Sequence, residues 1–371
     1  MHPLRGFSAV LYKEFITIAR DRASLFFMFF PAIIQIIAYG YALDMDVKHM
    51  PMVVWNEDRT AESFALVDRF VNTESFRVAG QAGGPEEVAS AIRSGRALVG
   101  LLIPPDYSRD LRAGRTAHIE VVVDGSNSTP AMKAVQTAMG VTFADSIKAL
   151  VAASGRALPV EVRPQVLYNP AMLSPNFYIP GMVGLALQLA TLFATTLSIV
   201  RERESGTIEN LIVARPSRWG LMLGKLTPYL CISMAMAGML FLIMRYVFLI
   251  PVAGSQLALF VSSLVYVFTM LSLGLLLSTW AKTHMHAFQM TLALVLPSVF
   301  FSGFIFPRES MPAVFYWFGA MLPSTYFIEL MRAIILRGAH WAEFWQNLAV
   351  LAAMGAVLFV WCVTRVTKRL G

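Results

Sequence analysis

Residues 178–200 read YIPGMVGLALQLATLFATTLSIV and carry no charged side chain. The hydrocarbon core of a bilayer is about 30 Å thick and needs roughly 20 apolar residues in helical form, because only internal hydrogen bonds satisfy the backbone there. The charged sequence RERE follows directly at 201–204. This stretch therefore predicts a membrane-spanning helix that ends at a polar surface.

Five more stretches of the chain meet the same requirement. The six expected spans are residues 23–43, 178–200, 226–250, 257–280, 286–306 and 344–364. Pro180 and Pro297 are expected to kink their helices. The first stretch could instead be a signal sequence, because Ala38 and Gly40 mimic a cleavage site, but its apolar core is too long for one. We predict an α-helical integral membrane protein with six transmembrane helices.

The composition of the 371-residue chain excludes an ordinary soluble enzyme, because 57% of its residues are hydrophobic and only 14% are charged, against about 25% charged in soluble domains. The net charge of +7 does not point to nucleic acid, since such proteins carry their basic residues on a polar domain and the mean hydropathy of this chain is +0.61. Cys231 and Cys362 both lie in apolar runs, which excludes a disulfide framework or a thiolate metal cage.

The distribution of Lys and Arg predicts the orientation in the membrane, because basic residues in short segments resist translocation. They gather before the first span, at 201–225, and after the last span. Both termini are therefore expected to be cytoplasmic.

Between the first two spans, residues 44–176 have a soluble composition and are expected to form one extracytoplasmic α/β domain. Short apolar runs bounded by Pro, Gly or Asp predict strands, and helical patterns separate them. The expected strands are 52–55, 98–103 and 119–123, and the expected helices are 62–71, 86–94 and 130–153. The domain pairs no nucleophile with a plausible base, so we expect no catalytic site.

The segment 1–22 before the first span contains an amphipathic pattern at residues 7–18, which predicts an interfacial helix. Glu14 falls within its apolar arc, where a bare carboxylate would be costly. We hypothesise that Glu14 pairs with a basic residue of the loop 201–225. The alternative is that Glu14 reaches water at the interface.

The loop after the second span predicts a short cytoplasmic helix at residues 206–215. Gly206 breaks the preceding helix, Thr207 can cap the new one, and Pro216 stops it. Two turns with an exposed apolar face are marginal alone, so the segment is expected to dock onto another surface. That surface is either a partner protein or the chain's own helical bundle.

Several ordered motifs resemble one known family, the permease subunit of type-2 ABC exporters, in the branch associated with multidrug efflux. Lys13-Glu14 with Arg20 resembles its interfacial helix, and 202–209 with Pro216 resembles its coupling segment. More distal matches are Tyr168-Asn169-Pro170, Pro180-Gly181, 301–307, Met311-Pro312, Pro323, Tyr326, Arg332 and Gly338. The resemblance covers nearly the whole chain, although the 44–176 domain matches only in size and position.

The resemblance implies a place in the inner membrane of the cell and two paired permease subunits, identical or not. It also implies that each coupling segment sits in a groove of a separate ABC ATPase. The implied coupling residues are Glu202, Glu204, Gly206, Thr207, Glu209, Leu211 and Pro216, and the implied interfacial residues are Lys13, Glu14 and Arg20. The sequence contains no Gly-x-x-x-x-Gly-Lys-Ser/Thr motif, so we expect the chain to bind no cofactor and ATP with Mg to be held by the ATPase. Whether a periplasmic adaptor and an outer-membrane factor take part stays open.

Residues 312–338 are too apolar for an exposed loop and are interrupted at Pro323, which predicts a re-entrant or surface-lying helical pair. By resemblance this segment forms the outer gate, with Pro323, Tyr326, Glu329 and Arg332 as its residues. Glu329 and Arg332 are three apart and could pair on one helical face. A simple structural lid is the alternative.

A mainly apolar path would suit an amphiphilic, drug-like cargo. Candidate path residues are Gln188, Thr191, Thr195, Met236, Met239 and Gln289, each of which could instead be a helix-packing residue. A lipid or polysaccharide exporter of the same family and an ATP-independent channel or secondary transporter are the competing functions. An intramembrane enzyme is disfavoured because the spans lack Asp and Glu, and His284 and His286 lack the further ligands of a metal site.

Overall fold

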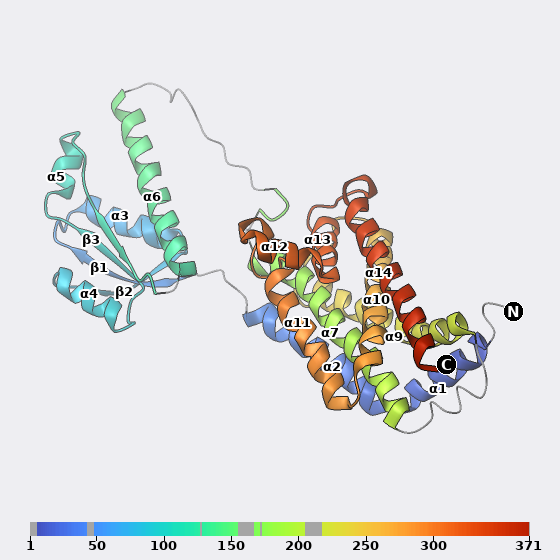
Figure 1. The fold of residues 1–371 in the computed structure, drawn as a ribbon. Helices are drawn as coiled ribbons and strands as arrows, with labels where there is room; N and C mark the ends of the chain where they lie inside the picture. The colour runs from blue at the N-terminus through green and yellow to red at the C-terminus, as the bar shows by residue number, and fades with distance from the viewer. Residues whose placement is uncertain are drawn as a thin grey trace. The chain divides into compact units, whose positions relative to one another are not determined.

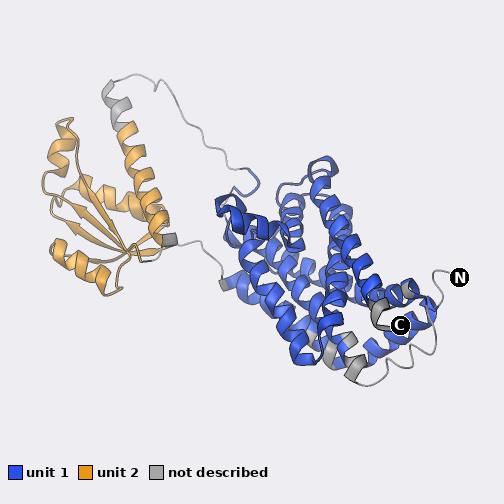
Figure 2. Ribbon diagram, in the orientation of Figure 1, with its two compact units in different colours: residues 1–44, 166–371 blue, residues 45–165 orange. Residues whose placement is uncertain are grey.

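The computed structural model describes residues 6–42, 48–126, 128–154, 167–170, 173–204 and 217–370. The chain divides into two compact units, one made of 1–44 with 166–371 and the other of 45–165 (Figure 2). The first unit is helical and the second is an α/β domain.

Ten helical elements of the helical unit follow one another in the described part of the chain (Figure 1). They are α1 Phe7–Arg20, α2 Arg22–Ala42, α7 Ser174–Glu204, α9 Arg218–Tyr246, α10 Gln256–Trp280, α11 His284–Phe301, η1 Arg308–Ser310, α12 Ala313–Ala320, α13 Pro323–Ile335 and α14 Trp341–Leu370.

Five described helices are long and apolar enough to cross a membrane. These candidate spans are Ser174–Leu197, Trp219–Tyr246, Gln256–Trp280, His284–Phe301 and Trp341–Arg365. The expected first span coincides with the 21-residue α2, within which Met28–Tyr41 is a shorter apolar helix. The protein is thus mostly helical with several apolar helices, whereas the count of six spans stays a prediction.

Two span ends differ from the expected ones because local capping decided them. The fifth span was expected to reach Phe306, but α11 ends at Phe301 and Gly303 then takes a φ of 83°. The resulting turn places Phe304 in the core, 1% exposed. α9 begins well before the expected start of the third span, because Ser217 caps it by accepting a hydrogen bond from the Gly220 amide at 3.0 Å.

Two helices, α7 and α10, form the centre of the helical unit, with about 70% of each apolar window buried (72% and 67%), whereas only 33%, 22% and 28% of the windows of α9, α11 and α14 are buried. Small residues let the central helices approach closely. The Thr196 hydroxyl of α7 donates to the Gly274 carbonyl of α10 at 3.2 Å, and the Thr269 hydroxyl of α10 donates to the Leu351 carbonyl of α14 at 3.2 Å.

The α/β unit contains a four-stranded sheet in the order β2-β1-β3-β4. β1 is parallel to β2 and β3, and β4 is antiparallel to β3. Its elements are β1 Met50–Asn56, α3 Ala61–Asn72, β2 Phe76–Gln81, α4 Pro85–Arg93, β3 Val99–Ile103, α5 Tyr107–Arg112, β4 Glu120–Val123 and α6 Ser128–Ser154.

Both faces of this sheet are covered. Leu66 and Phe70 of α3, with Ala134 and Ala138 of α6, join one core cluster, and Val88 and Ala91 of α4 join the other. The expected strands and helices of this region are present, but β2 and α5 were not predicted from the sequence. β2 is an edge strand whose one fully buried residue is Phe76, so its sequence lacks an apolar run.

Candidate functional site

The amphipathic helix α1 packs against the first turns of α9 (Figure 1). Val10, Glu14 and Ile18 recur every fourth residue and form its buried face. A Cβ added to Gly224 of α9 would lie 2.9 Å from the Val10 Cβ, so the two helices touch with no space for a side chain at that position. α1 is therefore packed directly against α9.

An ion pair lies inside this contact. The Lys225 Nζ atom is 3.7 Å from Glu14 Oε1, and the two side chains are only 5% and 3% exposed. The Lys13 ammonium, on the exposed side, is 3.4 Å from the same oxygen. Lys225 is the last residue of the loop to which the sequence hypothesis assigned the partner of Glu14. Arg20, the other interfacial residue singled out, is exposed in the last turn of α1.

The expected coupling residues fall largely outside the described part of the chain. Glu202 and Glu204 belong to the last turn of α7. Gly206, Thr207, Glu209, Leu211 and Pro216 lie outside the described residues, as does the whole segment 206–215. In this region the structure therefore describes α1 and the start of α9. Helix α9 follows segment 206–215 in the chain.

The candidate path residues on α7 take part in packing within the chain. Gln188 is 2% exposed, and its Nε2 donates to the Ser298 hydroxyl of α11 at 2.9 Å. Thr191 and Thr195 are buried, and their hydroxyls donate hydrogen bonds to the Leu187 and Thr191 carbonyls of the same helix. These contacts are those of helix-packing residues.

The three other path residues differ in exposure. Met236 is fully buried, Met239 is half-buried, and Gln289 is exposed on α11. The six residues consequently do not share one exposed surface of this chain.

The segment 312–338 is a helical pair, α12 and α13, divided just before Pro323, which occupies the first turn of α13. α13 is almost entirely buried, against α7, α10 and α14. α12 exposes its aromatic side chains, with Trp317 67% exposed. The Tyr326 hydroxyl donates to the Ala320 carbonyl at 2.9 Å and so joins the two helices.

The expected pairing of Glu329 with Arg332 is wrong. Both residues belong to the described part of the chain, yet no ion pair within 4.0 Å joins them, and Glu329 is exposed. Arg332 instead donates to the carbonyls of Gly303 at 2.8 Å, Phe304 at 3.1 Å and Phe177 at 3.3 Å. Arg332 binds these carbonyls because they surround the buried side of α13. A spacing of three residues predicts neighbours on a helix surface, but it does not say which side of the helix is buried.

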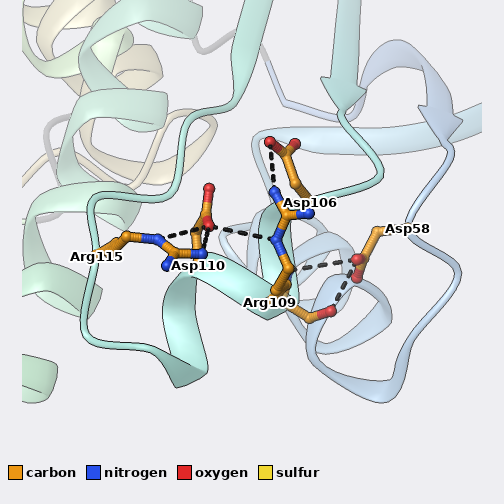
Figure 3. Close-up of polar contacts among 6 residues, drawn as sticks. Asp58, Asp106, Arg109, Asp110 and Arg115 are labelled. Carbon is orange, nitrogen blue, oxygen red and sulfur yellow. Dashed lines mark hydrogen bonds and ion pairs between the residues drawn. The ribbon is translucent and has the colours of Figure 1, made fainter.

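In the α/β unit, polar side chains gather around α5 (Figure 3). Arg109 lies 3.3 Å from Asp106 and 3.6 Å from Asp110, and Arg115 also pairs with Asp110. The arginines are more than half exposed, so these pairs contribute little to stability. The residues described in the structure include no group of three or more His, Cys, Asp or Glu that could hold a metal.

Asp58 ties the loop after β1 to the start of α5. It accepts hydrogen bonds from the Ser108 hydroxyl at 2.8 Å, the Ser108 amide at 3.3 Å and the Thr60 hydroxyl. Burial alone would raise the pKa of Asp58, but the hydrogen bonds from Thr60 and Ser108 outweigh it and lower the pKa below 3.8. The ionised form is therefore the one that the fold stabilises.

Since the folded pKa is depressed, Asp58 is expected to stabilise this junction above its unfolded pKa and to lose that effect as the pH falls through the folded pKa. At pH 6, Asp58→Asn should reduce hydrogen-exchange protection of residues 104–112 by about 0.5–1 kcal/mol, a value lowered for solvent screening. The difference between the two proteins should shrink as the pH falls through the folded pKa of Asp58. Asp106→Asn, at an exposed pair, is the control. Equal protection at pH 6 would show that the bonds are unimportant.

Comparison with known proteins decides the family. The family model described as ABC-2 family transporter protein matches residues 22–362. This chain belongs to the ABC-2 transporter family.

Three relatives from Escherichia coli (strain K12) match the permease over nearly its whole length. It is 28% identical over 98% of its length to "Probable multidrug ABC transporter permease YbhS", covering 97% of that protein. It is 26% identical over 94% to "Probable multidrug ABC transporter permease YbhR", covering 96%. It is 24% identical over 100% to "Inner membrane transport permease YhhJ", covering 99%. The chain is thus a multi-pass membrane permease of an ABC transporter.

Sequence reasoning missed several contacts of the permease. The carbonyl partners of Arg332 and the Ser298 partner of Gln188 come from other elements and turns, distant in the chain. A carbonyl belongs to every residue, so it leaves no mark in the sequence. The signal that could have pointed to Arg332 is an arginine within a mainly apolar helical segment, which must find polar partners.

Proposed function

We propose that this permease provides the membrane path of an ATP-driven exporter for amphiphilic, drug-like small molecules. Two permease subunits would pair and alternate between inward-open and outward-open states, while separate ATPase subunits bind ATP and Mg. In this proposal both termini and segment 206–215 are cytoplasmic, and the α/β domain is extracytoplasmic. The cargo class rests on the names of YbhR and YbhS, which are called multidrug permeases.

The observation that carries the proposal is the buried Glu14–Lys225 contact. It joins α1 to a membrane-spanning candidate helix, α9, close to where that helix emerges from segment 206–215. A displacement of that segment by an ATPase would act on α9 directly and on α1 through the ion pair and the Val10–Gly224 packing. Repacking of the bundle by such a motion is the way in which closure of a partner can open a path.

The test uses the permease purified together with its ATPase and reconstituted in liposomes. ATP-dependent, vanadate-sensitive transport of the dye ethidium is the expected result. Flux driven by an ion gradient without ATP would contradict the proposal and favour a secondary transporter. Transport of a fluorescent lipid but not of ethidium would indicate that the cargo is a lipid and not a drug-like molecule.

A paired variant tests the coupling segment. Glu209→Ala with Leu211→Asp should either release the ATPase or leave hydrolysis without export, because it removes a charge and places a carboxylate on the apolar docking face. Lys282→Ala, at an exposed residue between α10 and α11, is the control and should behave as the unaltered protein. Normal export by the double variant would remove the coupling role from 206–215.

A further inference from the structure

Arg332 has an environment that the gate assignment does not explain. Its guanidinium lies largely inside the protein, donates to three backbone carbonyls and stacks on the Phe177 ring, with its Cζ atom 3.7 Å from the ring centroid. The carbonyls belong to two segments, the first turn of α7 and the turn after α11. One side chain of α13 therefore holds three parts of the chain.

The planar fork of the arginine suits this arrangement. Its Nε, Nη1 and Nη2 atoms each reach a different carbonyl, at Phe177, Gly303 and Phe304 respectively. A lysine ammonium is a compact point charge on a flexible stem and cannot span three acceptors in that plane. Charged donors make stronger hydrogen bonds than neutral ones, so the three contacts act together as a strong tie.

Close apolar packing surrounds the same junction. A Cβ on Gly181 of α7 would lie 2.8 Å from the Phe304 ring, and a Cβ on Gly184 would lie 3.0 Å from the Phe327 ring of α13. Phe327 stacks on Tyr266 of α10 with ring centroids 3.9 Å apart, and the Tyr266 hydroxyl donates to the Gly184 carbonyl at 2.9 Å. α13 thus has no free space along α7 in which to slide.

The last turn of α13, which contains Arg332, is also attached to the connection before α10. The Ala253 amide, in the connection before α10, donates to the Ile335 carbonyl at 3.0 Å. A Cβ on Gly254 would lie 2.6 Å from the Ile334 carbonyl oxygen, so the backbones are in contact there. The C-terminal end of α13 is therefore held by these backbone contacts as well as by Arg332.

We propose that Arg332 is a positioning residue that makes α13, the first turn of α7 and the turn at Gly303-Phe304 one mechanical body. Opening of the outer side moves this body as a whole, and α13 does not swing away from α7 as a separate gate. This inference rests on the proposed export function for its role in transport, but the tie itself is a property of the lone chain.

The first measurement is hydrogen exchange of the permease alone in lipid nanodiscs, without an ATPase. Arg332→Lys should raise exchange in α13 and around residues 177 and 303–304 together, by roughly ten-fold, the size that loss of one charged hydrogen bond gives. Arg337→Lys, an exposed arginine five residues on, should change none of these segments. Unchanged exchange in Arg332→Lys would overturn the proposal.

The second measurement uses the complex with its ATPase, compared without nucleotide and with ATP and vanadate. In the unaltered protein the three segments should change their exchange together or not at all, and a change in α13 alone would overturn the proposal. Arg332→Lys should lower ethidium export by roughly ten-fold while ATP hydrolysis stays within two-fold. A merely structural role would lower both equally.

Two provisions keep the outcomes distinct. If Arg332→Lys does not assemble, Phe177→Leu removes the stacked ring and keeps its backbone carbonyl, and it should act in the same direction with a smaller size. If the unaltered complex moves no ethidium with ATP, the exporter proposal fails while the exchange result on the lone permease still decides the tie.

Discussion

Glu14→Gln is expected to weaken the packing of α1 on α9 by about 3–5 kcal/mol, the usual cost of breaking a buried ion pair by removing one of its members. The glutamine amide is neutral, whereas the Lys225 ammonium stays 5% exposed and loses the carboxylate that lies 3.7 Å away. Lys225→Met should cost a smaller amount, because Lys13 still lies 3.4 Å from the carboxylate it leaves behind.

A double-mutant cycle measures this interaction. The proteins are heated in detergent and the folded fraction is followed by size-exclusion chromatography, from which the loss of thermal stability is obtained. The double variant, Glu14→Gln with Lys225→Met, should lose less stability than the sum of the two single variants, because both charges of the pair are removed together. Asp106→Asn, at an exposed ion pair of the α/β unit, is the control and should leave stability unchanged. Strictly additive losses would mean that the two side chains do not interact.

The same variants test the role of the contact in transport. If α1 follows the motion of α9 through this pair, Glu14→Gln should reduce ethidium export more than ATP hydrolysis in the complex with the ATPase. Exchange of the two residue types, Glu14→Lys with Lys225→Glu, should recover part of the export. Full export by a correctly inserted Glu14→Gln protein would make the contact dispensable.

Gly274→Ala is expected to destabilise the helical unit by about 1–3 kcal/mol, the usual cost of adding a carbon to a filled core. A Cβ at Gly274 would overlap the Thr195 hydroxyl and lie 3.1 Å from the Thr195 Cβ and 3.3 Å from the Leu192 carbonyl oxygen. The backbone cannot move aside easily, because the hydroxyl of Thr196, on the same helix as Thr195, donates a hydrogen bond to the Gly274 carbonyl.

Two comparisons separate crowding from the general effect of removing a glycine. Gly238 of α9 has nothing within 4 Å of a Cβ, so Gly238→Ala should keep or slightly raise thermal stability. Adding Thr195→Ala to Gly274→Ala removes the overlapping hydroxyl and should restore part of the loss. If Gly274→Ala is as stable as Gly238→Ala, the close approach of α7 and α10 is not a determinant of stability.

The long apolar helices could be predicted from the sequence because the requirement is local. A helix that satisfies its own backbone needs only a sufficient run of apolar residues, and 256–280 or 341–365 contain one. The break at Pro323 is local in the same way, because proline cannot donate the hydrogen bond that would continue α12. The β1 and β3 strands, buried on both faces, likewise appear as short apolar runs.

The candidate site could be predicted only in part. Glu14 was identifiable because a carboxylate in an apolar arc demands a partner, and the choice among the basic residues of the loop required the structure, which brings Lys225 to it. The Glu329–Arg332 pairing was wrong because helix spacing says which residues are neighbours on a surface, not which of them faces the core. The partners of Arg332 lie 28 to 155 residues away.

The sequence alone indicates the class of molecule, a membrane permease with an inserted α/β domain. Hydropathy, charge distribution and ordered motifs carry this information because each of them depends on residues that are neighbours in the chain. Tertiary packing decided which helices lie at the centre, where a glycine allows another helix to approach, and which carbonyls accept hydrogen bonds from the guanidinium of Arg332. Such contacts join residues whose types are common in every membrane helix, so only their arrangement in space distinguishes them.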